Sequence, residues 1–188
     1  DVSRIPSPAA GAEQATLDAL EAACAAKPAA FIVEPLILGA GGMLMYPAWV
    51  LREMAAICAR HDVLFIADEV MTGWGRTGTL FACEQANVAP DILCVAKGIT
   101  GGAIPLAATL ASGRIFDAHL STDRAKMFFH SSSYTANPIA CAAAAANLSI
   151  WADEDVLGRI ATLSQRVSER LADLDGQAFA NPRQQGTV

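Results

Sequence analysis

Short apolar runs that each end in one charged residue constrain the fold of this chain more than any other feature. VLFIA at residues 63–67 is followed by Asp68, and DILCVA at residues 91–96 is followed by Lys97. AFIVE at residues 30–34 has the same character. Short apolar runs bounded by turns are typical of buried parallel strands. We therefore expect a sheet whose neighbouring strands end in charged side chains.

Segments with helical spacing lie between these runs and after them. Residues 47–61 predict an amphipathic helix, with an apolar face formed by Trp49, Val50, Met54, Ile57 and Cys58. Further helices are expected at residues 16–27, 81–86, 138–151 and 154–174, further strands at 106–111 and from 128, and loops at 1–12 and 35–42. Strands that alternate with helices through short loops predict an α/β layered domain.

The carboxyl edge of the expected sheet is where such folds place ligands. Lys97 stands among apolar residues and glycines, so we expect it to be buried and to pair, lose its proton or react. Asp68 either caps the next turn or faces a protonated ring nitrogen. A lysine that forms a Schiff base and an aspartate that keeps a pyridine nitrogen protonated are what a pyridoxal phosphate site requires. Val70 would pack on the ring, and Glu69 would point to the other face in a structural role.

The loop HSSSYTANP at residues 130–138 precedes an alanine-rich helical segment. Its hydroxyls and free backbone N–H groups suit a phosphate, although serine and threonine are also common helix caps. The glycines at 39–42 either cradle an anion or turn the chain. We expect His130 to be structural, and Arg76 to hold a loop carboxylate without taking part in catalysis.

Composition excludes several classes of partner. The net charge is −6 and the pI is near 4.9, which argues against a nucleic-acid or anionic-membrane partner. The five cysteines are odd in number and contain no C-x-x-C, so neither a disulfide framework nor a metal site is expected. A reducing cytoplasm is the expected location. No signal peptide or membrane-spanning segment is apparent in the sequence.

Four motifs across residues 31–151 resemble those of the class III aminotransferases of fold type I. They are IVEPLILGAGGM, IADEVMTGWGRTG, PDILCVAKGITGG and HSSSYTANPIACAAA. The resemblance implies a three-layer α/β/α large domain with a mostly parallel sheet, pyridoxal 5'-phosphate as cofactor, and a homodimer. Residues 1–152 would be the C-terminal part of that domain, and residues 153–188 the start of a small C-terminal domain.

The resemblance also implies residue roles. Lys97 would bind the cofactor covalently and shuttle protons, Asp68 would contact the pyridine nitrogen, and Val70 would pack on the ring. Ser132 and Ser133 would reach the cofactor phosphate across the dimer interface. Two positions depart from the family, because many relatives have threonine at position 133 and glutamine at position 38, where this chain has Leu38.

Ser131 would lie against the substrate. Within the class, residues 80–102 and 128–148 are most similar to the branch that transfers an amino group from S-adenosylmethionine to 8-amino-7-oxononanoate, giving 7,8-diaminononanoate in biotin biosynthesis. Two alternatives are another ω-aminotransferase, acting on a diamine, β-alanine or a similar donor, and a module without cofactor. The chain is expected to be the middle of a longer enzyme and to be inactive alone.

Overall fold

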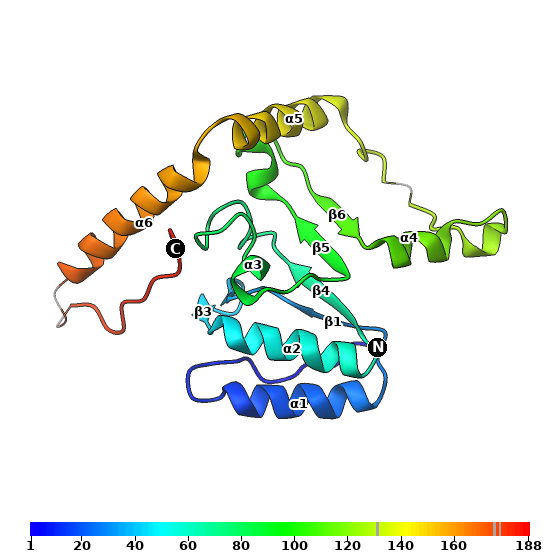
Figure 1. The fold of residues 1–188 in the computed structure, drawn as a ribbon, viewed down its shortest axis with the longest axis horizontal. Helices are drawn as coiled ribbons and strands as arrows, with labels where there is room; N and C mark the ends of the chain where they lie inside the picture. Colours follow the sequence, from blue (N-terminus) through cyan, green and yellow to red (C-terminus); the bar gives the residue numbers. More distant parts are fainter. Residues whose placement is uncertain (131, 175, 177) are drawn as a thin grey trace.

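A four-stranded sheet forms the centre of the computed structural model (Figure 1). The described residues are 1–130, 132–174, 176 and 178–188. The strands are β1 (Ala30–Val33), β4 (Leu64–Asp68), β5 (Ile92–Val95) and β6 (Ala108–Ala111), in the order β1-β4-β5-β6. The first three are parallel, and β6 runs antiparallel to β5. The prediction of an α/β fold with a mostly parallel sheet is confirmed.

Two helices, α1 (Glu13–Ala25) and α2 (Ala48–Arg60), pack together next to this sheet (Figure 1). The predicted apolar face of α2 is largely correct, but Trp49 is 45% exposed, and Leu51 is fully buried in its place. Trp49 lies four residues before the exposed Glu53 and therefore shares its face. Leu51 lies three residues before the buried Met54.

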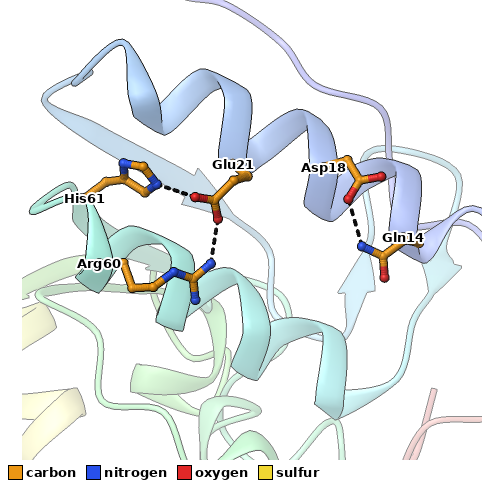
Figure 2. Close-up of polar contacts among 5 residues, drawn as sticks. All are labelled: Gln14, Asp18, Glu21, Arg60 and His61. Atoms are coloured by element: carbon orange, nitrogen blue, oxygen red, sulfur yellow. Dashed lines mark hydrogen bonds and ion pairs between the residues drawn. The ribbon is translucent and has the colours of Figure 1, made fainter.

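A carboxylate joins the two helices at their surface, as Figure 2 shows. The oxygens of Glu21 on α1 lie 2.5 Å from Arg60 Nη2 and 2.5 Å from His61 Nε2, at the end of α2. The hydrogen bonds from His61 and then Arg60 lower the pKa of Glu21. Gln14 and Asp18 form a separate hydrogen bond of 2.8 Å along α1 (Figure 2).

The segment expected as a loop at residues 35–42 contains a strand, so that prediction is wrong in part. β2 (Ile37–Leu38) pairs antiparallel with β3 (Leu44–Met45) in a small hairpin. The backbone N–H of Gly39 donates to the Glu34 carboxylate at 2.9 Å. The carboxylate of Glu34, directly after β1, therefore stabilises the turn of this hairpin.

Three helices in the second half of the chain extend beyond the sheet (Figure 1). They are α4 (Gly113–His119), α5 (Pro138–Asp153) and α6 (Val156–Ala172), whereas α3 (Cys83–Ala86), η1 (Lys97–Thr100) and η2 (Arg124–Lys126) are short. In Figure 1, α4 and α6 project from opposite sides of the sheet. Neither α4 nor α6 has a buried residue.

Two expectations for this half are wrong. Residues 128–130 have no regular secondary structure, so the strand expected to begin there does not form. In addition, α4 lies in a segment where no helix was predicted. The end of the chain returns to the core, where the Thr187 N–H donates to the Arg76 carbonyl at 2.8 Å. None of the helices in the described residues combines the length and the apolar character needed to span a bilayer.

Candidate active site

The carboxyl ends of β4 and β5 lie at the same edge of the sheet. Asp68 is the last residue of β4, and it is in register with Cys94 of β5. The Glu69 N–H donates to the Cys94 carbonyl at 2.9 Å, which extends the pairing one residue beyond β4. Lys97 follows three residues after Cys94. The expected gathering of Asp68 and Lys97 at one sheet edge is confirmed.

Lys97 opens η1 in a left-handed backbone conformation, with φ of 48°. Its side chain is exposed and lines a large cleft, so the prediction of a buried lysine is wrong. The apolar neighbours explain the difference, because Val95 and Ile99 turn into a small core cluster beneath the turn. Lys97 is thereby left at the surface of the cleft with its amine available for chemistry.

The cleft has a volume of about 2110 Å³. This is more than twice the upper end of about 1,000 Å³ that is usual for small-molecule sites. Its lining includes Val70, Trp74, Arg76, Ala96, Lys97, His130, Ser132, Asn147 and Trp151. The cleft therefore offers an amine, a hydroxyl and a guanidinium within a largely apolar wall.

Asp68 is half-buried beside this cleft and is not among its lining residues. Its Oδ1 accepts the Val70 N–H at 3.1 Å, which is the turn-capping bond that the sequence allowed for. No other hydrogen bond or ion pair to this carboxylate occurs within residues 1–130, 132–174, 176 and 178–188. A carboxylate has room for several more donors, so capping leaves Asp68 free to bind a cation.

Glu69 is fully buried and has a structural role, as expected. Its carboxylate accepts the Thr72 hydroxyl at 2.7 Å. It also accepts the backbone N–H groups of Ala82 at 3.0 Å and Cys83 at 2.8 Å, at the start of α3. Of the two adjacent acids at the end of β4, Glu69 thus stabilises the fold, whereas Asp68 keeps acceptor capacity for a ligand.

The serine loop differs from a simple phosphate nest. Ser132 and Ser133 are both exposed, but only Ser132 lines the cleft, and Ser131 lies outside the described residues. The first backbone N–H groups of α5 are capped by the Asn137 side chain, which accepts from Ile139 at 3.0 Å and Ala140 at 3.3 Å. These two N–H groups are therefore not free for an anion, whereas the side chains of Ser132 and Ser133 are exposed.

Arg76 and His130 also lie at the cleft. Arg76 has no ion pair within the described part of the chain, so the expectation that it holds a loop carboxylate is not met there. His130 stacks on Phe128 with ring centroids 6.0 Å apart, which agrees with a structural role. Sequence reasoning missed Trp74 and Asn147, which contact the turn of Lys97. Only a three-dimensional contact could have revealed them.

The chain belongs to the class III aminotransferases. The family model described as Aminotransferase class-III matches residues 4–188. The chain is 44% identical over 147 residues to the adenosylmethionine-8-amino-7-oxononanoate aminotransferase of Geobacter sulfurreducens, covering 78% of this chain and 32% of that protein. It is also 44% identical over 149 residues to an omega-aminotransferase of Caulobacter vibrioides, covering 77% of this chain and 34% of the relative.

A solved structure has the same fold. An amine transaminase from an uncultivated Pseudomonas species, in a PLP-bound form, superposes with a TM-score of 0.81 at 40% identity. The match covers 93% of this chain and 40% of that chain. This chain thus spans about a third of the length of the curated relatives it matches. Class III aminotransferases are pyridoxal phosphate enzymes.

The side chains at the cleft and beside it fit the ring of this cofactor. The exposed Lys97 amine can bond to an aldehyde carbon, and the half-buried Asp68 carboxylate has unused acceptor capacity. Val70 adds an apolar surface. These are the three kinds of group that a pyridine ring bearing an aldehyde needs.

Proposed function

We propose that this chain is part of a pyridoxal-phosphate-dependent aminotransferase. The observation that carries the proposal is the position of Lys97 on a cleft. Lys97 follows β5, and Asp68, whose carboxylate has unused acceptor capacity, ends the neighbouring parallel strand β4. We further propose that the enzyme transfers an amino group from S-adenosylmethionine to 8-amino-7-oxononanoate, giving 7,8-diaminononanoate in biotin biosynthesis. The name of the Geobacter relative supports this choice of substrates.

When bound, pyridoxal phosphate supplies an electron sink that lets the amino-bearing carbon of a substrate lose a proton. Lys97 would hold the cofactor through Nζ and would move that proton as a general base and acid. Asp68 would keep a proton on the pyridine nitrogen through a charge-assisted hydrogen bond. Val70 would pack on the ring and exclude water.

The serines complete the proposed site. The hydroxyls of Ser132 and Ser133 would donate hydrogen bonds to the cofactor phosphate, and Ser131 would contact the substrate. In the proposed homodimer, Ser132 and Ser133 would serve the site of the partner copy. The exposed position of both side chains supports this part of the proposal, because neither is used by the core of its own chain.

The proposed homodimer would also cover apolar surface. Large side chains are exposed along α4, the loop after it and the start of α5, namely Phe116, Leu120, Met127, Phe128, Phe129, Tyr134 and Ile139. Exposed apolar patches of this kind mark interaction surfaces.

We also propose that residues 1–152 belong to a large cofactor-binding domain, and that a small domain begins with residues 153–188. A break between α5 and α6 supports this boundary, since Asp155 caps α6 by accepting the Gly158 N–H at 2.9 Å. The proposed location is a reducing cytoplasm, which suits five cysteines that are all free.

The second candidate function is an ω-aminotransferase that uses a diamine or β-alanine as donor, because the Caulobacter relative is as similar as the Geobacter one. Amino transfer by the purified full-length protein should be measured with each donor, both to 8-amino-7-oxononanoate and to a simple 2-oxo acid. Turnover with S-adenosylmethionine and little with β-alanine or a diamine would support the first assignment. The reverse pattern would establish the second, and no turnover with any donor would favour a module without cofactor.

A further inference from the structure

The turn that carries Lys97 is held by a side chain from a distant part of the sequence. Asn147, in the middle of α5, donates through Nδ2 to the Gly98 carbonyl at 2.9 Å and to the Ile99 carbonyl at 3.1 Å. Both carbonyls belong to η1, so one amide group holds two consecutive peptide units directly after Lys97. Asn147 also lines the cleft.

The backbone at Lys97 needs such support. A residue with a Cβ atom is unfavourable in the left-handed region, and it persists there only where the surrounding structure holds it. Within the turn itself, the Gly98 carbonyl accepts only the Gly101 N–H, at 3.0 Å, and Gly101 is also left-handed with φ of 61°. The amide of Asn147 supplies side-chain hydrogen bonds that connect this turn to a long helix.

Trp74 holds the same turn from another direction. A Cβ atom at Gly98 would lie 2.4 Å from the Trp74 Cβ and 2.6 Å from its Cγ. Only glycine fits against the indole at this position, and the Trp74 ring in turn packs edge-on against Trp151 of α5, with ring centroids 6.0 Å apart. The turn after Lys97 is therefore enclosed by Trp74 and α5.

The alanine-rich composition of α5 explains how Asn147 reaches the turn. Ala140 and Ala144 are buried and lie four residues apart, and Asn147 follows three residues later on the same helical face. Ala144 packs in the cluster formed by Val95 and Ile99. Small side chains at these positions let α5 approach η1 closely enough for a short amide to bond to its carbonyls.

We propose that Asn147 is a positioning residue for Lys97, acting by fixing the left-handed turn that presents the amine to the cleft. The proposal rests on the proposed function of Lys97. The side chain at position 147 must donate hydrogen bonds to the two carbonyl oxygens. An aspartate of the same shape has no N–H group to donate, and it would place a negative charge against these oxygens. The role is therefore specific to the amide of asparagine.

The test compares N147D with the wild-type protein in the absence of cofactor. Hydrogen exchange of the peptide that contains residues 98–101 should accelerate about tenfold or more, whereas exchange in β4 should stay unchanged. S149A is the matched control on the same helix, because the Ser149 hydroxyl donates only to the Ala145 carbonyl of its own helix. Where N147D does not fold, N147A serves in its place.

The same variants are then treated with pyridoxal phosphate and borohydride. We expect the rate of cofactor attachment to Lys97 to fall about tenfold in N147D. Reductive methylation of Lys97 by formaldehyde should not change, because that reaction needs only an exposed amine. Exchange and attachment equal to those of the wild-type protein and S149A would overturn the positioning role. Absence of attachment in the wild-type protein would instead overturn the proposed function, and the positioning role would fall with it.

Discussion

The region around α1 and α2 and the region around α4 and α6 differ in what their apolar residues do. In the first, Leu20, Leu51 and Met54 are buried within the chain and form one continuous core. In the second, Phe116, Leu120 and other large apolar side chains are exposed, and neither helix has a buried residue. Burial within this chain stabilises the first region. The second region leaves its large apolar side chains exposed, which is typical of an interaction surface.

The largest expected effect is on the stability of the core. L51A should lower the free energy of unfolding by about 2–5 kcal/mol, because it removes a fully buried side chain and leaves a cavity. L120A is the matched variant in the other region, where the side chain is 69% exposed, and it should change the value by less than about 0.5 kcal/mol. Urea denaturation measures both. Equal losses would contradict the contrast between the regions.

A smaller loss is expected where the core meets the site. E69Q should lower the free energy of unfolding by about 1–3 kcal/mol, since an amide cannot accept all the hydrogen bonds that the buried carboxylate accepts. E84Q is the control, because the exposed Glu84 accepts one bond, from the Phe81 N–H. Thermal or chemical unfolding of the two variants gives the comparison. A loss in E84Q that matched the loss in E69Q would contradict the structural role assigned to Glu69.

The smallest expected effect concerns the surface contact between α1 and α2. Glu21 has a lowered pKa in the folded protein, so its contribution to stability is present above its ordinary value of 4.5 and is lost as the pH falls through the lowered pKa. In E21Q, the free energy of unfolding should therefore differ less between about pH 6 and about pH 3 than it does in the wild-type protein. D18N removes a neighbouring carboxylate that bonds to an uncharged glutamine, and it serves as the control. Identical pH dependence in E21Q and the wild-type protein would exclude the effect.

The sequence predicted those parts of the fold that are marked by a continuous apolar run or by a helical period of apolar residues. The strand before Asp68 and the strand before Lys97 were found because they are apolar throughout, and α2 because its apolar residues recur at helical spacing. The hairpin of β2 and β3 was missed because strands of two residues carry no period. α4 was missed because a helix of seven residues that begins with glycine is too short to show a sustained helical period.

The candidate site was predictable to a similar degree. Motifs located Lys97, Asp68 and the serine loop, but they could not tell how far each side chain is exposed. Lys97 was expected to be buried because its neighbours are apolar, yet those neighbours fold away beneath it. The contact of Asn147 with the turn of Lys97 spans 49 positions of the sequence, and no local pattern encodes a contact of that kind.

The most direct test of the central claim is the site of cofactor attachment. The full-length protein should be mixed with pyridoxal phosphate, reduced with borohydride and digested, and the modified peptide identified by mass spectrometry. We predict attachment at Lys97, with Lys27 and Lys126, the other lysines of this sequence, unmodified at stoichiometric cofactor. Attachment spread over the lysines, or full attachment that persists in K97A, would contradict the assignment.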